Sequence, residues 1–432
     1  GEVHGRILSF LYAELYALIG YAFEQRLHEK VILQELLIEV YNCFEEEELP
    51  GYRRIQQIIY WFESDYSEIT VAHRIQEAVD PKLDFAAKIV MESDLKDLRY
   101  LYRYGEYITE NERKMAEFMN SLDEETVEKM ASTFTEGYRI GFVLGGKDLS
   151  KKQTVNIRYM VGFERMVRLA IRNFEKMGLK PVIYRAALER INKKGVHRIG
   201  YYGAIPNRQF DYDHRADQAI YLDKAFMERR LGVMRSAYEN YKTLANGHAG
   251  PACIDTFGEP EFYPQTKQEA YYLSDKQKKL QTQMDNESVQ ITNRYIIGKE
   301  RSFTIIAFPV PEIGADFPEI FKETIRINTL DYQLYADIQQ KLIDALDQGE
   351  SVHVLGKGEN HTDMYIALHK LNDPKKQTNF ENCVADVNIP VGEVFTSPIL
   401  KGTSGILEAC TVYLEGLKYE KLHLEFEDGM VK

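Results

Sequence analysis

The spacing of the apolar residues changes along this chain, and that change limits the folds open to it. Up to about Gly146 apolar side chains recur every three or four residues, as in residues 31–44, which is typical of amphipathic helices. After the glycine pair at 145–146, short apolar runs that suit strands alternate with helical segments. From Ser351 onward apolar and polar residues mostly alternate one by one. The chain is therefore predicted to be α/β, because strands that alternate with helices form largely parallel sheets.

This pattern predicts three regions: a helical domain at 1–146, an α/β domain at 147–350 and a mostly β region at 351–432. The middle region should contain helices at 165–178 and 226–245, and a later helix capped by Asn328 or Thr329. Apolar residues of that later helix share one face, which should pack on the core; they are Leu334, Ile338, Leu342, Ile343 and Leu346. Expected strands lie at 181–184, 253–257, 302–308, 352–355, 361–368, 408–414 and 422–426.

Charge and cysteine content narrow the classes of partner. The formal net charge of −13 argues against nucleic acid as the main partner, because phosphate binding needs a basic face. Four scattered cysteines without a C-x-x-C pair favour a reduced, cytoplasmic location. No signal peptide is apparent, and the apolar stretch at 7–23 contains Glu14, so a core helix is expected there rather than a membrane span.

Familiar catalytic signatures such as H-E-x-x-H, G-x-S-x-G and the P-loop are absent from the sequence. Two groups of possible metal ligands occur instead. The first group has spacing that matches neither an EF-hand nor a zinc site, so a solvated acidic loop is expected; it comprises Asp211, Asp213, His214 and Asp217. In the second group His361 and Asp363 would share one face of a strand, and His369 and Glu393 could complete a site. Alternatively, the turn before His361 leaves this side chain in solvent, and the group does not bind a metal.

Glu393 is the strongest single candidate. It follows Pro390 and Gly392, which fix a loop, and it precedes an apolar Val–Phe pair and Pro398. A carboxylate held between a rigid turn and apolar side chains is costly to bury without a partner, so a cation is a plausible neighbour. The alternative is an exposed glutamate at the start of a strand. If Glu393 binds a cation, we expect its side chain to lie in a polar cleft.

The segment around Glu393 resembles a known family. Residues 388–398 read N-I-P-V-G-E-V-F-T-S-P, which is similar to the N-I-P-x-G-E-V-F-T-[AS]-P signature of the thermophilic-type metalloaminopeptidases, the aminopeptidase T and S family. Residues 358–364 resemble that family's G-x-x-T-D-L strand, and the likeness runs from about Lys147 to the end. The helical region at 1–146 looks like the extension of longer bacterial members.

The resemblance implies an enzyme that releases N-terminal residues from peptides with two zinc or cobalt ions, in a homodimer. It makes Glu393 a metal ligand and the region 351–432 the beginning of the metal-site domain. The family's other ligands, a second glutamate, a histidine and a His-x-Asp, lie downstream of the signature. Because residues 358–364 resemble the T-D-L strand, the resemblance implies that His361 and Asp363 have a structural role and are not metal ligands.

The chain ends inside an expected hairpin, with a turn at Asp428–Gly429, so we expect a fragment with little activity of its own. Two alternatives remain open. One is a non-catalytic scaffold or dimerisation module that keeps the fold without the chemistry. The other is a different metal hydrolase that uses the group around His361.

Overall fold

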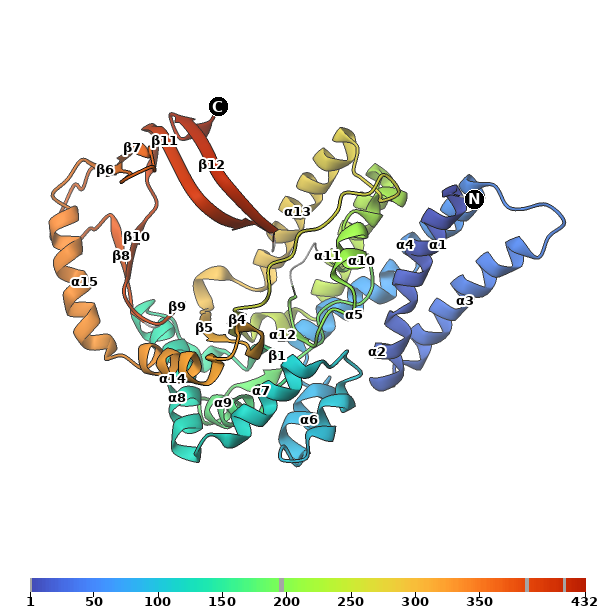
Figure 1. Ribbon diagram of the computed structural model, residues 1–432, viewed down its shortest axis with the longest axis horizontal. Coiled ribbons are helices and arrows are strands. Elements are labelled where there is room, and N and C mark those ends of the chain that lie inside the picture. The colour runs from blue at the N-terminus through green and yellow to red at the C-terminus, as the bar shows by residue number, and fades with distance from the viewer. Residues whose placement is uncertain (1, 194–197, 385–387, 415–416) are drawn as a thin grey trace.

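The first third of the chain is helical, in agreement with its periodicity. The computed structural model describes residues 2–193, 198–384, 388–414 and 417–432 (Figure 1). The elements of this part are α1 (Glu2–Leu15), α2 (Ala17–Phe23), α3 (Leu27–Phe44), α4 (Tyr52–Asp65), α5 (Ser67–Val79), α6 (Phe85–Glu92), η1 (Leu98–Tyr104), α7 (Glu110–Ser121), α8 (Glu124–Leu144) and η2 (Leu149–Lys151). Local capping helps to fix these boundaries. The Thr109 side chain caps α7 and Glu112 bonds back to the Thr109 main chain, which forms a capping box.

A parallel sheet forms the centre of the molecule and confirms the predicted α/β class. Its strands are β1 (Thr154–Met160), β2 (Lys180–Val182), β3 (Tyr201–Tyr202), β4 (His248–Phe257), β5 (Thr304–Pro309) and β9 (Asn388–Ile389). Their order is β2-β1-β4-β5-β9, with β3 paired to the end of β1, and every pairing is parallel. Chain order reverses direction between β1 and β4, which makes that position the topological switch point of the sheet.

The helices that follow β1 match the predictions in part. They are α9 (Glu164–Lys176), α10 (Arg208–Asp213), α11 (Lys224–Asn240), α12 (Lys242–Asn246), α13 (Asp275–Tyr295), α14 (Phe317–Asn328) and α15 (Tyr332–Leu346), with short turns η3 (Asp217–Ile220), η4 (Gly298–Glu300) and η5 (Pro311–Ile313). The expected cap at Asn328 or Thr329 was wrong, because Asn328 ends α14. Asp331 caps α15 instead, and its side chain accepts from the main-chain N–H of Gln333 and of Leu334.

The expected core face of α15 was also wrong in part. Ile343 is buried, but Leu334, Ile338 and Leu342 are about half exposed, at 55%, 46% and 52%. Gln339 is buried in their place, because its amide bonds to the strands that α15 covers. Periodicity identifies an apolar stripe but does not identify the side of the helix that meets the sheet.

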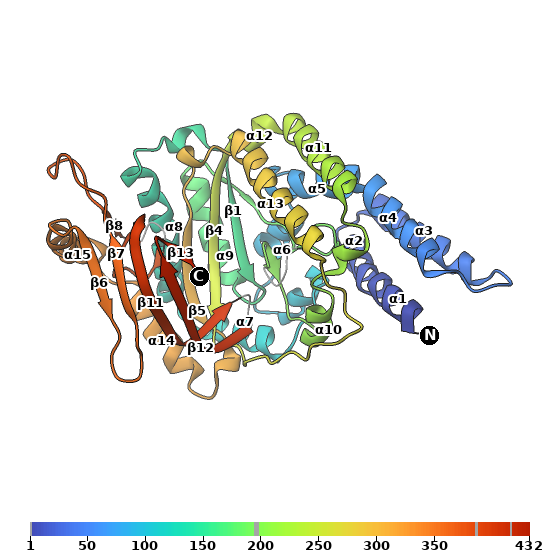
Figure 2. The ribbon, with the colours of Figure 1, turned by 90° about the horizontal axis from the view of Figure 1, so that it is seen from above.

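The C-terminal part is antiparallel, as the one-by-one alternation predicts. Its strands are β6 (Ser351–Leu355), β7 (Asp363–Ala367), β8 (Phe380–Cys383), β10 (Glu393–Thr396), β11 (Ile399–Leu414), β12 (Leu417–Glu427) and β13 (Met430–Val431). One sheet has the order β13-β12-β11-β7-β6, and β8 pairs with β10 in a second, smaller one. The expected hairpin at Asp428–Gly429 is confirmed by the pairing of Phe426 with Val431. Figure 2 shows the long β11–β12 ribbon and the parallel strands from above.

Among the described residues, two large hydrophobic cores hold the helical and α/β parts together. The first joins β1, β4 and β5 to helices α6–α9 and α14, where Phe308 of β5 stacks on Phe321 with ring centroids 5.0 Å apart. The second lies among α1–α5 and α11–α13, with Ile7, Ile59 and Phe226 in its interior. Each core contains residues from both sides of residue 147. The helices of 1–146 therefore pack on the rest of the chain through buried apolar faces.

One stretch of the described residues, His4–Phe23, is long and apolar enough to cross a membrane by length and composition alone. It lies near the N-terminus, and 44% of it is buried inside the molecule. The stretch spans α1 and α2, which are separated at Tyr16, and its inward residues Phe10 and Tyr21 belong to the second core. Buried helices of water-soluble proteins and signal sequences have the same composition, so this finding is weak evidence for a span.

Candidate functional site

Glu393, the predicted metal ligand, is the first residue of β10 and its side chain is exposed. It lies four residues after the end of β9, the edge strand of the parallel sheet, and Gly392 adopts a φ of 123° in the turn between them. Within the described residues its carboxylate accepts a hydrogen bond from Nδ2 of Asn388, at 3.2 Å. A carboxylate has about four acceptor sites, so this one keeps most of its capacity to bind a cation. Glu393 is not among the described residues that line the cavities of about 770 Å³ and about 490 Å³.

The main chain at Glu393 is held by a buried amide. Gln339 of α15 is 3% exposed, and its Nε2 lies 3.0 Å from the carbonyl oxygen of Glu393. The same nitrogen lies 2.9 Å from the carbonyl oxygen of Cys383 and 2.8 Å from Oδ1 of Asn382, both on the paired strand β8. One amide thus joins α15 to both strands of the β8–β10 pair. The backbone of Glu393 is fixed while its carboxylate remains accessible.

The second group of predicted ligands is not brought together. His361 and Asp363 lie on one exposed face, as expected, but each contacts a different partner: Nδ1 of His361 lies 3.1 Å from Oε2 of Glu408, and Oδ1 of Asp363 lies 2.8 Å from Nε2 of His353. His369 is exposed, and its carbonyl accepts from Nδ2 of Asn379. In the part of the chain that the structure describes, no three His, Cys, Asp or Glu side chains are placed to hold a metal ion.

Glu408 of β11 forms an ionic cluster that sequence reasoning missed. Its two oxygens lie 3.1 Å from Nδ1 of His361 and 3.0 Å from Nδ1 of His423, its cross-strand neighbour on β12. The main-chain N–H of His361 also donates to it, and these bonds lower the pKa of Glu408 to about 2. The partners of Glu408 depend on strand register, which the sequence does not specify.

The acidic group at 211–217 is not a solvated loop, and that expectation was wrong. Asp217 and His214 are buried, with Nδ1 of His214 2.7 Å from Oδ2 of Asp217. Nε2 of His214 lies 2.8 Å from Oγ of Ser9 on α1. The side chains of Asp211 and Asp213 pair with Lys193 and Lys267. Burial against α1 explains the difference for His214, whose two ring nitrogens both have partners, whereas Oδ1 of Asp217 is buried without a hydrogen-bond partner among the described residues.

The Ser9–His214–Asp217 chain has the hydrogen-bond order of a catalytic relay, but it is built into packed structure. The space beside His214 and Asp217 measures about 10 Å³, which is room for about one water molecule. We interpret this chain as a polar tether between α1 and the segment that follows α10.

The switch point of the sheet, where doubly wound proteins usually bind ligands, is filled by side chains. Glu164 begins α9 directly after β1 and is fully buried. It accepts hydrogen bonds from the hydroxyl of Tyr100 at 2.7 Å and from the N–H of Gly162 at 2.9 Å. Burial raises the pKa of Glu164 to about 7 despite these donors. Tyr104 and Tyr159 share a buried hydroxyl pair beside it, so this position is packed core.

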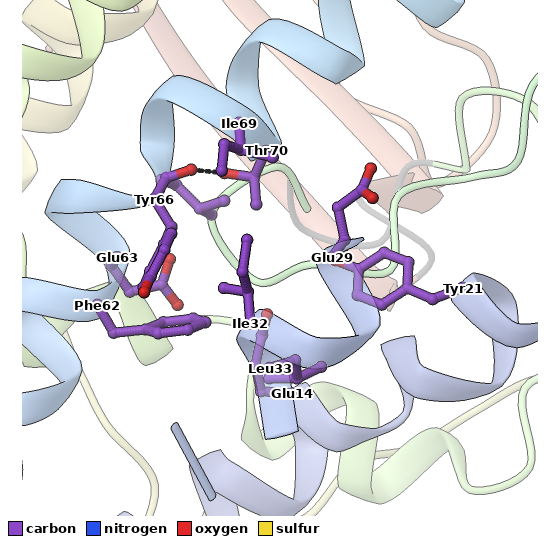
Figure 3. A pocket seen from close by; sticks show the side chains of 11 residues that line it. Glu14, Tyr21, Glu29, Ile32, Leu33, Phe62, Glu63, Tyr66, Ile69 and Thr70 are labelled. Atoms are coloured by element: carbon purple, nitrogen blue, oxygen red, sulfur yellow. Dashed lines mark hydrogen bonds between the residues drawn. The ribbon is translucent and has the colours of Figure 1, made fainter. Parts of the chain in front are cut away.

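Another group of buried acids surrounds a small pocket among α1–α5 (Figure 3). Burial raises the pKa of Glu14 to about 7 and raises that of Glu63 well above its ordinary value. Figure 3 shows Glu63 beside the rings of Phe62 and Tyr66, below the hydrogen bond between the Thr70 hydroxyl and the Tyr66 carbonyl. The pocket measures about 10 Å³ and therefore accommodates no substrate.

Comparison with known proteins gives little support for any assignment. No protein-family model matches the chain, and no curated protein matches its sequence. Among solved structures the chain is similar to one titled "Wild-type AmpT from Thermus thermophilus". The two share 14% identity over 71% of this chain and 70% of that one, with a TM-score of 0.37. An overlap at this level carries no argument about function, which must rest on the residues themselves.

Proposed function

We propose that this chain is part of a metal-dependent aminopeptidase and that Glu393 supplies one ligand of its metal site. The observation that supports the proposal is the segment 388–398, which resembles the family signature and presents Glu393 as an exposed carboxylate on a fixed backbone. Its substrates would be peptides with a free N-terminus. Zinc or cobalt is the expected metal, with two ions in the complete site and a homodimer as the assembly.

The described residues do not complete such a site. Catalytic zinc sites use about three protein ligands, and here one exposed carboxylate stands without an imidazole or a second carboxylate placed beside it. No catalytic step is therefore derived from this chain. We propose that the remaining ligands come from residues that follow Lys432 in the reading frame, as the family resemblance implies.

Zinc titration tests this proposal. Calorimetry of the metal-free 432-residue chain should show weak binding, and hydrolysis of a leucine anilide should be close to background. A chain extended by the residues that follow Lys432 should bind zinc tightly and hydrolyse the anilide. In that longer chain Glu393→Gln should lower both by at least tenfold, whereas Glu381→Gln, an exposed glutamate on the adjacent strand β8, should change neither.

Two results would overturn the proposal. One is full activity of the Glu393→Gln extended chain. The other is tight, stoichiometric zinc binding by the 432-residue chain that is lost in His361→Ala, since that outcome would assign the metal to the His361 group.

A second candidate, a dimerisation module, is favoured by the exposed apolar face of α15. Leu334, Ile338 and Leu342 recur every four residues on that face and are about half exposed. Apolar side chains grouped on a surface often mark a protein interface. Sedimentation velocity tests this candidate: a dimer that Ile338→Lys converts to monomer supports it, and a monomeric parent chain refutes it.

A further inference from the structure

A large cavity that Glu393 does not line lies among the described residues. It measures about 770 Å³ and is bounded by α1, α2, α5, α11 and parts of the segments 184–193 and 198–207. In Figure 1 α1 and α2 lie towards the right end of the long axis, α5 and α11 lie near its middle, and β10 lies towards the left end. Small-molecule sites typically occupy 300–1,000 Å³, so the space is large enough for an organic ligand.

The wall of this cavity is mainly aromatic and apolar. Aromatic rings from several elements line the cavity. They include those of Tyr12 of α1, Tyr16 directly after α1, Tyr184, Phe210 of α10 and Tyr238 of α11. Aromatic side chains bury large areas and pack favourably against planar ligands. The wall therefore favours a ligand with an apolar, flat body.

The charges of the wall are unequal. Its described residues include five cationic side chains, Arg74, Arg190, Lys193, Arg198 and Arg230, and two carboxylates. Both carboxylates are already paired: Glu106 with Arg185, and Asp211 with Lys193. Outside the wall, Glu77 pairs with Arg74 and Asp217 lies 3.8 Å from Arg190, but the wall itself has more cations than carboxylates, which favours an anionic ligand.

Two of these cations lack full hydrogen bonding. The Arg190 side chain is 8% exposed, its Nε has no hydrogen-bond partner among the described residues, and the carboxylate of Asp217 lies 3.8 Å from it. Nη1 of Arg230 is buried without a partner in the same set of residues, and its Nη2 lies 3.5 Å from Oδ1 of Asn192. A buried guanidinium whose N–H groups are unmatched is costly, and an anion in the adjacent cavity would compensate it.

Neighbouring acids compensate Arg230 only in part. Burial raises the pKa of Glu63 well above its ordinary value, which favours its neutral form near Arg230. Burial lowers the pKa of Arg230, and the nearby Tyr221, Glu63 and Asp285 oppose that shift only in part.

We propose that this cavity binds a small aromatic anion, a carboxylate, sulfonate or phosphate on a planar apolar body. Arg190 and Arg230 receive the anionic group, and the tyrosine-rich wall holds the ring. The site is separate from Glu393 and does not depend on peptidase activity.

A matched pair of dyes tests the proposal. 8-Anilinonaphthalene-1-sulfonate carries an aromatic body and one negative charge, and N-phenyl-1-naphthylamine is the same body without the charge. The 432-residue chain should bind the sulfonate at one site per chain, at least tenfold more tightly than the neutral amine. Arg190→Met and Arg230→Met should each weaken sulfonate binding by at least tenfold and leave amine binding nearly unchanged. Arg235→Met is the control, because Arg235 lies on the same helix α11 but does not line the cavity.

A second variant keeps the test decisive if an arginine variant fails to fold. Ala187 lines the cavity and is half-buried, so Ala187→Trp should fill part of the space and weaken both dyes while every charge remains. Circular dichroism establishes that each variant is folded before titration. The proposal is overturned if the two dyes bind equally, if binding is not saturable, if Arg235→Met matches the cavity variants, or if folded Ala187→Trp binds like the parent.

Discussion

Replacing Glu164 by glutamine should remove a pH-dependent loss of stability that this buried acid imposes. The pKa of Glu164 is raised from 4.5 to about 7, chiefly by burial, although the Tyr100 hydroxyl and the Gly162 N–H both donate to it. A raised pKa means that the folded state holds the proton more tightly. The contribution is therefore fully present below pH 4.5 and is lost as the pH rises from 4.5 to about 7.

The size of the effect follows from the shift. Each pKa unit corresponds to about 1.4 kcal/mol, so the folded protein should lose about 3 kcal/mol between pH 4.5 and pH 8 through this one group. Glutamine keeps an oxygen that can accept the two hydrogen bonds, and it does not ionise. Its buried NH₂ lowers stability by about 1–3 kcal/mol at every pH, which leaves the pH-dependent difference unaffected.

Urea unfolding followed by circular dichroism, at several pH values from 4.5 to 8, measures this difference. The free energy of unfolding of Glu164→Gln relative to the parent should rise by about 3 kcal/mol across that range. Glu175→Gln is the control, because Glu175 lies on the same helix and is exposed. A constant difference for Glu164→Gln across the range would refute the assignment of Glu164 as a buried acid that is neutral below pH 7.

Other substitutions test the remaining features of the fold. Gln339→Leu removes the amide that joins α15 to the β8–β10 pair and should lower stability by about 2 kcal/mol; unchanged urea unfolding would contradict its role as a clamp. Glu408 has a lowered pKa, so its contribution is present above pH 4.5 and lost as the pH falls towards 2. The melting temperature of Glu408→Gln should therefore lie below that of the parent at pH 7 and converge with it near pH 2, and equal melting temperatures at pH 7 would count against the cluster. Gly250 has a φ of 113°, and a Cβ there would lie 1.8 Å from the Ser302 carbonyl oxygen, so Gly250→Ala should cost about 3 kcal/mol. Gly298→Ala, where a Cβ meets nothing within 4 Å, should melt within about 2 °C of the parent if crowding is the cause.

Much of the architecture could be predicted from the sequence because it depends on local spacing. Apolar periodicity predicted the helices before residue 146, the strand–helix alternation of the parallel sheet and the hairpin at Asp428–Gly429. The turn residues before Glu393 predicted its place at the start of a strand. The cap of α15 was not predicted correctly: Asp331 caps this helix, three residues after the expected Asn328. Aspartate and asparagine both cap helices well, so residue type alone does not distinguish the two positions.

The environment of each polar side chain was decided only by the tertiary structure. Asp217 and His214 read as solvated because neither their spacing nor their neighbours in sequence indicate burial against Ser9, which lies about 205 residues away. Gln339 interrupts an apolar stripe in the sequence, yet it is buried in α15 while Leu334, Ile338 and Leu342 are about half exposed. Glu408 and its two histidines meet through the register of three strands. The physical reason is common to all of them: spacing along the chain fixes which residues share a face, whereas the partner of that face depends on contacts between distant segments.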